Sequence, residues 1–320
     1  MYTIQTQDLS KTYKNGVNAL NSLNIQVKEG EVFSLLGPNG AGKSSLIKIL
    51  TTQCLATKGK AFILGIDTQK NPSSIRPLIS CVSQSISIDN HMSLKENFIF
   101  QARLYSLDNK TIKQRMTTLI DSFKLSEYVK YPISTYSGGI KRRLDIAMNM
   151  ISFPKVLFLD EPTTGMDVQS RRAMWDMIQK IKETFRTTIF LTTHYLEEAD
   201  ILSDSICIIK DGKELIQASP YELKRLTGNS MIKIGLTDAK LLPSCCRYIE
   251  SLKLCSSSYI RGESAFFVSD DSDSSFPLII RALLDKPFYV KSADITSPSL
   301  EDVFIDLISK KEVKEDKKVC

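Results

Sequence analysis

The segment Gly37-Pro38-Asn39-Gly40-Ala41-Gly42-Lys43-Ser44 decides the fold of this chain, because it has the spacing G-x-x-x-x-G-K-S of a phosphate-binding P-loop. The apolar run Val32–Leu36 precedes it, and apolar residues at helical spacing follow it, so we expect a strand, a loop and a helix. Glycines let backbone amides face phosphates, and the N-terminus of a helix attracts the same anion. A chance glycine-rich turn is the alternative, and a chain of this length would match the pattern by accident about once in a hundred cases. The segment therefore predicts nucleotide binding.

Two carboxylates follow a second apolar run, in the segment Val156-Leu157-Phe158-Leu159-Asp160-Glu161. In a P-loop site, Lys43 would reach the β- and γ-phosphates, and the Ser44 hydroxyl would ligate Mg²⁺. Asp160 would hold Mg²⁺ through its water shell, and Glu161 would act as a general base or orient the attacking water. Two acids after a strand usually lie in a solvated loop, but beside a P-loop they predict a Walker B pair and ATP hydrolysis.

A second anion site is predicted at Ser137-Gly138-Gly139, where a serine and two glycines begin a helix. The basic residues Lys141, Arg142 and Arg143 follow in its first turn, where they oppose the helix dipole. They indicate a phosphate or an acidic partner nearby, or else simply solvated charge. A second phosphate site in a chain with one P-loop suggests that a second copy of the chain completes each nucleotide site.

These motifs together resemble the nucleotide-binding subunit of an ATP-binding cassette (ABC) transporter, over roughly residues 2 to 228. Tyr136-Ser137-Gly138-Gly139-Ile140 resembles the signature L-S-G-G-Q, with substitutions at its two ends. The resemblance also identifies Gln84 as the Q-loop glutamine, Thr163–Asp167 as the D-loop, Thr193-His194 as the switch and Tyr13 as the adenine-stacking aromatic. Ile140 and Ser83 depart from the usual pattern, but neither position supplies a phosphate ligand.

The resemblance implies an α/β fold, the P-loop NTPase ABC cassette, with a parallel core sheet, an antiparallel β subdomain and a helical insertion. It implies ATP and Mg²⁺ as cofactors and an ATP sandwich between two copies of the chain. The expected catalytic residues are Glu161, His194 and Lys43, and the expected Mg²⁺ residues are Ser44, Gln84 and Asp160. The expected nucleotide-binding residues are Tyr13, Gly37, Pro38, Asn39, Gly40, Ala41, Gly42, Lys43, Ser44, Ser45, Gln84, Ser137, Gly138, Gly139 and Asp167.

Two further segments, His194–Asp200 and Pro298–Phe304, resemble the daunorubicin-resistance branch of bacterial exporter ATPases, as does the arginine pair after the signature. In that branch the ATPase and the membrane permease are separate chains, and the resemblance implies export of drugs, lipids or polysaccharide. We expect the permease to contact the region from Gln84 to Tyr105. The apolar side chains there could belong to the core or to the contact surface; they are Ile86, Ile88 and Met92.

The composition is that of an ordinary globular protein: 320 residues, 42% hydrophobic and 24% charged. No apolar run approaches the roughly 20 residues of a membrane helix, and the first residues lack signal-peptide features, so we expect a peripheral protein on the cytoplasmic face of the cell membrane. The net charge of +6 is mild, and the basic residues are spread along the chain. We therefore expect no nucleic-acid partner. The seven cysteines show no disulfide framework, and we interpret Cys245-Cys246 as helix residues rather than metal ligands.

The pattern of apolar runs predicts three parts: an ABC domain at residues 1–228, a small α+β accessory domain at 229–310 and a charged tail at 311–320. The accessory part shows no chemical motif, and bracing of the cassette is the simplest interpretation. One alternative function is a soluble ABC-type ATPase clamp acting on nucleic acid or ribosomes, but such proteins usually have tandem cassettes or long coiled coils. A P-loop kinase or GTPase is the other alternative, but the mechanism of such an enzyme does not require the Ser137 signature or His194.

Overall fold

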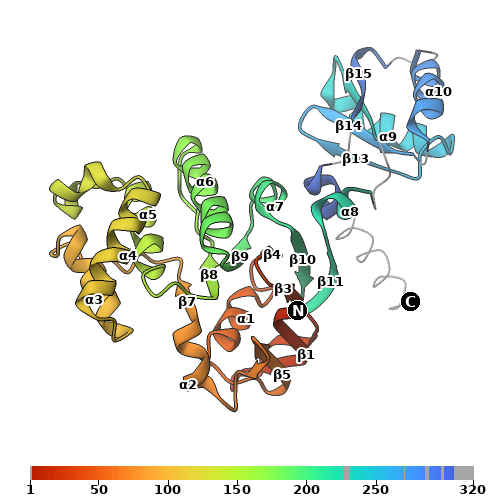
Figure 1. Cartoon of the computed structure of the whole chain (residues 1–320). Helices are drawn as coiled ribbons and strands as arrows, with labels where there is room; N and C mark the ends of the chain where they lie inside the picture. Colours follow the sequence, from red (N-terminus) through yellow and green to blue (C-terminus); the bar gives the residue numbers. More distant parts are fainter. Residues whose placement is uncertain (1, 226–230, 270, 285–287, 297–298, 306–320) are drawn as a thin grey trace. The chain divides into compact units, whose positions relative to one another are not determined.

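A computed structural model describes residues 2–225, 231–269, 271–284, 288–296 and 299–305 (Figure 1). The chain divides into two compact units, Met1–Ser219 and Pro220–Cys320. The sequence-based boundary at 228 lies among residues 226–230, which are outside the described part. Within the described residues, no helix combines the length and the apolar character needed to cross a bilayer.

The centre of the first unit is a six-stranded sheet in the order β11-β10-β4-β9-β8-β7, parallel except for β11 (Figure 1). Its strands are β4 (Val32–Leu36), β7 (Ile79–Val82), β8 (Val156–Asp160), β9 (Thr188–Thr193), β10 (Ser205–Lys210) and β11 (Lys213–Ala218). Every residue of β4 and β9 is buried, because helices or another sheet cover both faces. The parallel core sheet predicted from the continuous apolar runs is confirmed.

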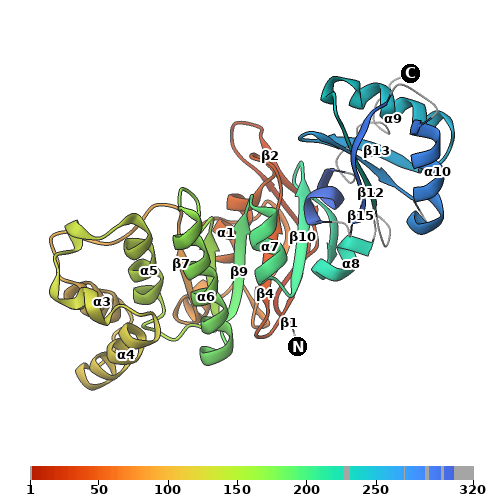
Figure 2. The same cartoon turned by 90° about the horizontal axis from the view of Figure 1, so that it is seen from above.

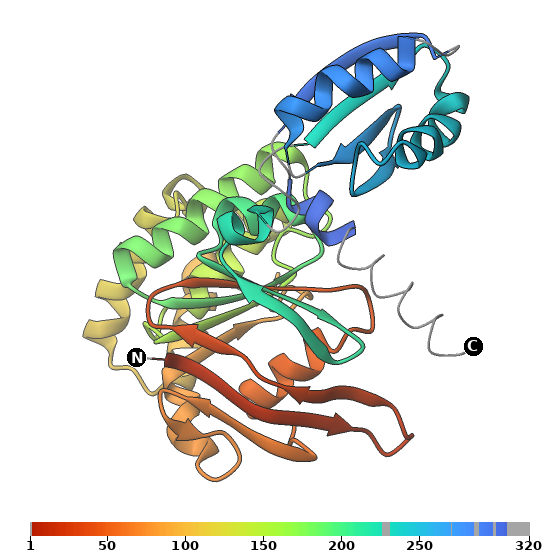
Figure 3. The same cartoon turned by 90° about the vertical axis from the view of Figure 1, so that its right-hand side faces the viewer.

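The two faces of this sheet pack against different layers. One face packs on α1 (Lys43–Leu50) and on an antiparallel sheet of β1 (Tyr2–Thr12), β2 (Asn18–Leu23), β3 (Gln26–Lys28), β5 (Lys58–Ile63) and β6 (Ile66–Asp67), which forms a separate layer (Figure 3). The other face packs on α6 (Val168–Phe185) and α7 (Leu196–Leu202). Short helical segments α2 (Pro72–Ile75) and η1 (Arg76–Leu78) lead into β7.

The alternation of apolar and polar residues from 19 to 27 predicts a single strand, but the structure interrupts this stretch. β2 ends at Leu23 and β3 begins at Gln26, and Ser22, near the end of β2, adopts a left-handed φ of 51°. The break is held by Thr6, whose hydroxyl donates to the Leu23 carbonyl (2.9 Å) and accepts from the Ile25 amide (2.8 Å). A hydroxyl side chain thus replaces the ladder hydrogen bonds where the strand bends.

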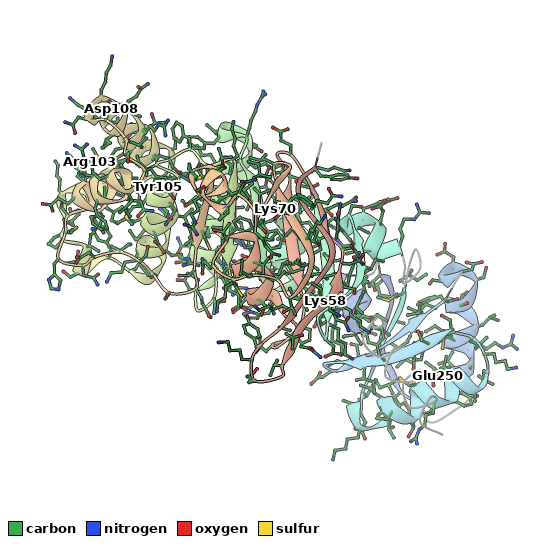
Figure 4. The ribbon with its side chains drawn as sticks, turned by 90° about the horizontal axis from the view of Figure 1, so that it is seen from below. Lys58, Lys70, Arg103, Tyr105, Asp108 and Glu250 are labelled. Atoms are coloured by element: carbon green, nitrogen blue, oxygen red, sulfur yellow. The ribbon has the colours of Figure 1, made fainter. Side chains whose placement is uncertain are left out.

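The helical insertion consists of α3 (Leu94–Leu104), α4 (Asn109–Ser122) and α5 (Gly138–Asn149), with the short turns η2 (Ser126–Lys130) and η3 (Ile133–Thr135) between α4 and α5. It lies beyond the β7 edge of the core sheet (Figure 2). The pattern Ser93-Leu94-Lys95-Glu96 predicts a capping box, and the structure confirms it: Glu96 N donates to Ser93 Oγ (3.2 Å), and Ser93 N donates to Glu96 Oε2 (2.7 Å). Arg103 and Asp108 lie at the connection from α3 to α4, where Asp108 caps α4 (Figure 4).

The second unit is an antiparallel sheet with two helices on one face. It contains α8 (Pro220–Arg225), β12 (Met231–Leu236), η4 (Ala239–Leu241), α9 (Leu242–Ser251), β13 (Ser257–Arg261), β14 (Ser264–Val268), α10 (Ser272–Leu284) and β15 (Val290–Thr296). The strand order is β13-β14-β12-β15, and α9 and α10 share the apolar core on one face. Cys245 and Cys246 lie in α9 inside this core, and burial raises the pKa of Cys245 to about 12.

A short helical segment at residues 300–305 covers the other face of this sheet, with Leu300 and Val303 buried. Ser299 donates from its amide to Asp302 Oδ2 (2.7 Å), and Arg261 on β13 donates to Asp302 Oδ1 (2.9 Å). The pair Ser297-Pro298 predicts a helix start, with a cap followed by proline at the first helical position, and it lies outside the described residues. Within this unit, residues 299–304 are therefore held to the sheet by these hydrogen bonds and by the buried Leu300 and Val303.

Candidate active site

The P-loop joins β4 to α1, and glycine is required at two of its positions for steric reasons. Gly42 has φ +103° as the N-cap of α1, and a Cβ there would lie 2.3 Å from the Ala19 carbonyl oxygen. At Gly37 a Cβ would lie 2.5 Å from the Ile209 carbonyl oxygen. The loop thus passes close to two neighbouring strands, and its first helical amides keep no side-chain cap. Those free amides are the donors that a phosphate requires.

Lys43 is held inside this loop. Only 7% of the residue is exposed, and its Nζ donates to the carbonyl oxygens of Gly37 (2.7 Å) and Pro38 (3.1 Å). Burial lowers the pKa of Lys43, while the charges of Glu161 and Asp160 oppose that shift. The ammonium group is therefore fixed between the P-loop backbone and the two carboxylates that the sequence placed in the site.

Asp160 and Glu161 follow one another at the end of β8, but different contacts orient them. Asp160 Oδ1 accepts a hydrogen bond from the Thr192 hydroxyl on β9 (2.6 Å). Glu161 adopts a left-handed φ of 46°, and its amide donates to Thr192 O (3.1 Å). A non-glycine residue with this φ is strained, and such strain gathers at functional sites because the surrounding structure must maintain it.

Three side chains from separate segments converge on the Glu161 carboxylate. Its Oε2 lies 3.5 Å from Gln84 Nε2, which follows β7, and 3.4 Å from His194 Nδ1, which follows β9. The Thr164 hydroxyl donates to the same oxygen (3.2 Å). The carboxyl ends of neighbouring parallel strands thus bring Gln84, Glu161 and His194 together.

Tyr13 lies beside the start of α1. Its hydroxyl is 3.0 Å from Ser45 Oγ, and Lys11 Nζ lies 5.1 Å from the centre of its ring. The ring therefore belongs to the surroundings of the P-loop, although it comes from β1's hairpin in the other sheet. Stacking of adenine on this ring stays a prediction.

The signature serine and the D-loop aspartate are both helix N-caps. Ile140 N donates to Ser137 Oγ (3.4 Å) at the start of α5, and Ser170 N donates to Asp167 Oδ1 (2.9 Å) at the start of α6. The two helix starts touch, because a Cβ at Gly139 would lie 2.9 Å from Ser170 Oγ. A pocket of about 230 Å³ runs along this junction, and its lining includes Gln84, Ser137, Gly138, Gly139, Glu161 and Asp167.

Arg142 differs from what the sequence suggested for the basic triplet. Its side chain is neither solvated nor free for an anion, because only 3% of the residue is exposed. The guanidinium donates to the carbonyl oxygens of Ser83, Asp160 (3.1 Å) and Pro162 (3.2 Å). Lys141 and Arg143 on either side are half-buried. One member of the triplet is therefore part of the interior.

Glu198 on α7 is a buried residue that sequence reasoning missed. It is fully buried, and its Oε1 accepts hydrogen bonds from the hydroxyl of Thr163 in the D-loop (2.8 Å) and from Trp175 Nε1 on α6 (3.0 Å). Burial raises the pKa of this carboxyl group, and the hydrogen bonds oppose the shift. Glu198 belongs to the His194–Asp200 segment that resembles the exporter branch, but that resemblance does not indicate a buried contact with the D-loop.

The apolar residues after Gln84 separate into core and surface. Ile88 is buried in the core, whereas Ile86 is 42% exposed and Met92 is half-buried. On α3, three apolar side chains that the sequence analysis did not single out are exposed as well: Ile99, Phe100 and Leu104.

Comparisons with known proteins place these motifs in a family. The family model "ABC transporter" matches residues 20–164. The daunorubicin/doxorubicin resistance ATP-binding protein DrrA of Streptomyces peucetius is 34% identical over 99% of this chain and 98% of its own. The doxorubicin resistance ATP-binding protein DrrA of Mycobacterium tuberculosis is 39% identical over 76% of this chain and 73% of its own. The Nod factor export ATP-binding protein I of Rhizobium etli is 32% identical over 96% and 93%.

Solved structures agree with the fold. The structure of cbiO1 from Clostridium perfringens, described as part of the ABC transporter complex cbiONQ, matches with a TM-score of 0.64 and 26% identity over 69% of this chain and 90% of its own. The ATP-binding cassette MJ0796, solved as a dimer bound to ADP and Pi, matches with a TM-score of 0.60 and 24% identity over 68% of this chain and 98% of its own.

Proposed function

The chain belongs to the ABC transporter family as an ATP-hydrolysing subunit of the export type, and from that premise we propose that it energises a separate permease for a drug, a lipid or a polysaccharide. The observation that supports hydrolysis most directly is the convergence of Gln84, Thr164 and His194 on the Glu161 carboxylate, beside Lys43. Phosphoryl transfer to water needs these parts: a base, a cation that binds phosphate and two polar groups around the attacking water.

The phosphates of ATP would lie against the amides of Gly40 to Ser44. Lys43 would exchange the Gly37 and Pro38 carbonyls for phosphate oxygens, which are stronger acceptors because they carry charge. Glu161 would take the proton of the attacking water, and His194 would contact the γ-phosphate. Tyr13 would stack on the adenine.

The oxygen donors near the P-loop fit Mg²⁺, which prefers hydroxyl, carboxylate and amide oxygens. Ser44 lies in the first turn of α1, next to Lys43, and Asp160 presents a carboxylate of which one oxygen is oriented by Thr192. Gln84 adds an amide at the same end of the sheet. We assign the ion to these three residues, and its chemistry is to neutralise charge that develops on the transferred phosphoryl group.

We further propose that two copies of the chain close face to face on two ATP molecules. Ser137 and Gly138 are exposed at the start of α5, so this helix end is accessible to the γ-phosphate held by another copy. Asp167 caps the adjacent helix and would join the two sites. The related cassette MJ0796 was itself solved as a dimer.

The permease surface is proposed on the exposed apolar side chains that follow Gln84. Ile86 is 42% exposed, and on α3 the exposures are 40% for Ile99, 56% for Phe100 and 66% for Leu104. Exposed apolar side chains gathered on one short segment are typical of a protein contact. This contact would place the chain on the cytoplasmic face of the cell membrane.

The catalytic assignment is tested with Glu161→Gln, which keeps the shape of the side chain and removes the base. ATP binding should persist, turnover should fall by about 10³-fold, and ATP should trap a dimer visible by gel filtration. Glu183→Gln, an exposed residue of α6, is the matched control and should hydrolyse ATP normally. Hydrolysis by Glu161→Gln at the wild-type rate would contradict the assignment of the base.

The transport assignment is tested by purifying the chain from membranes with its co-extracted integral membrane protein. Phe100→Asp combined with Leu104→Asp should abolish that association and leave ATP hydrolysis by the isolated chain unchanged, because neither side chain lies near the site. Tyr131→Asp, at another exposed aromatic, is the control. Salt-dependent binding to nucleic acid, with no membrane partner, would favour the ATPase clamp instead.

A further inference from the structure

One face of the signature helix α5 carries a row of buried polar side chains. Arg142, Asp145 and Asn149 are spaced by three and four residues, so they share a face of the helix. They are 3%, 1% and 6% exposed. Charged residues are seldom buried to this degree without dedicated partners. We call this row the polar ladder.

Each member of the polar ladder holds one serine in or next to the segment that carries Gln84. The Ser80 hydroxyl on β7 donates to Asn149 Oδ1 (2.9 Å). The Ser87 hydroxyl donates to Asp145 Oδ1 (2.5 Å). Arg142 Nη1 donates to the Ser83 carbonyl, directly before Gln84. Ser83 and Ser87 lie on either side of Gln84 in the sequence. The helix α5 therefore makes hydrogen bonds to the Q-loop both before and after this glutamine.

Arg142 also makes hydrogen bonds to the segment that contains Glu161, the proposed catalytic base. Its Nη2 donates to Asp160 O (3.1 Å) and its Nε donates to Pro162 O (3.2 Å), the carbonyls on either side of Glu161. A guanidinium group is the one side chain whose planar fork can donate to three separate carbonyls at once. The position of Glu161, with its left-handed φ, is therefore tied to α5.

Packing alone does not explain this arrangement. Burying an ion is costly, and well-packed apolar residues often serve stability equally well or better. The same helix already provides such residues to the core, among them Leu144, Ile146 and Ala147. Arg142 has a carboxylate partner in Asp145 (3.5 Å), and its hydrogen bonds go to the backbone of two catalytic segments.

We propose that Arg142 is a positioning residue. Through the polar ladder it couples the signature helix α5, the Q-loop around Gln84 and the backbone at Glu161, so that the three segments move as one unit. The proposal rests on the two-copy site described above. When Ser137-Gly138-Gly139 closes on the ATP of the second copy, the displacement of α5 would reach Gln84 and Glu161 of its own site. Each site would then become competent only when its chain also engages the other.

The test measures kcat, KM and ATP affinity for the full-length chain with Arg142→Ala. Nucleotide affinity should stay within about twofold, because the P-loop is untouched, while kcat should fall about 10- to 100-fold, the range expected for misplaced catalytic groups. Arg143→Ala, one position along the same helix and outside the ladder, is the control and should keep kcat. Arg142→Lys, which keeps the charge but not the planar fork, should lose several-fold in kcat at an unchanged Tm. That variant decides the question if Arg142→Ala does not fold.

A double-mutant cycle separates positioning from a general loss of structure. Gln84→Ala should lower kcat much less in the Arg142→Lys background than in the wild type, since Gln84 is already displaced there; a difference of at least about threefold is expected. Additive effects of the two substitutions, or equal losses in ATP affinity and kcat, would overturn the proposal. If Glu161→Gln forms no ATP-dependent dimer, the proposed two-copy site is contradicted. If it dimerises but the two substitutions of the cycle have additive effects, only the proposed positioning role of Arg142 is contradicted.

Discussion

The helices α1 and α5 both present an N-terminus where a phosphate is expected, yet they are built differently. At α1 the N-cap is Gly42, no side chain caps the first turn, and Lys43 lies buried within the loop. At α5 the N-cap is Ser137, whose hydroxyl already accepts the Ile140 amide, and the first residues are exposed. The first site is thus assembled within one chain and keeps its donors free. The second already has a side-chain cap, and in the proposed dimer another copy of the chain would bring the phosphate to it.

The largest effect should follow from removing the cation of the first site. Lys43→Ala removes charge-assisted hydrogen bonds to two phosphates, and we expect ATP hydrolysis to fall by about 10³-fold and ATP affinity by about 10- to 100-fold. Lys48→Ala, an exposed lysine of the same helix, is the control. Isothermal calorimetry and a phosphate-release assay measure the two quantities. If Lys43→Ala bound ATP as tightly as the wild type, the proposed difference between the N-termini of α1 and α5 would be contradicted.

A smaller effect, on turnover only, is expected at the second helix end. Ser137→Ala should leave the affinity of the single chain for ATP unchanged and lower kcat about 10²-fold, because in the proposed dimer the serine would contact the nucleotide of the other copy. It also removes a helix cap worth about 1 kcal/mol. Ser93→Ala at α3 removes a comparable cap far from the signature, so it controls for that loss. Equal activity losses in the two variants would mean that Ser137 only caps its helix.

The conformation of the first loop can be tested by two glycine substitutions. Gly42→Ala places a Cβ 2.3 Å from the Ala19 carbonyl at φ +103°, whereas Gly40→Ala has φ +82° and open space around it. We expect Gly42→Ala to lower the free energy of unfolding by about 3 kcal/mol or more and Gly40→Ala by about 1 kcal/mol. Urea denaturation followed by fluorescence gives both values. Similar losses for the two variants would show that the crowding at Gly42 does not matter.

The sequence predicted the first site more completely than the second, for a physical reason. The P-loop with Lys43 and the pair Asp160-Glu161 each come after a continuous apolar run, and parallel strands bring such positions to one edge of a sheet, whereas the role of His194 is implied by the family resemblance. Arg142 could not be assigned in this way, because a run of three basic residues does not reveal which one faces the Q-loop. The interruption between β2 and β3 falls at Asn24 and Ile25, where no glycine or proline marks it, and nothing in the sequence indicates the left-handed φ of Ser22 near the end of β2.

The smallest effect concerns Glu198, which supports the D-loop beside α5 from within the core. Its raised pKa means that the folded state favours the protonated form, so its contribution to stability is complete below the ordinary carboxyl pKa and is lost as the pH rises through the raised value. Glu198→Gln keeps an oxygen for Thr163 and Trp175 and cannot ionise. Relative to wild type, its Tm should therefore rise by a few degrees as the pH increases from 5 to 8.

Two further variants complete the experiment on Glu198. Glu198→Ala leaves two buried donors unpaired and should cost about 1–3 kcal/mol at every pH. Glu197→Gln, the exposed neighbour on the same helix, should follow the wild-type curve. Differential scanning fluorimetry across the pH range measures all four proteins. If the Glu198→Gln and wild-type curves stay parallel, the carboxyl group does not change its ionisation in this range, and the support of the D-loop is independent of pH.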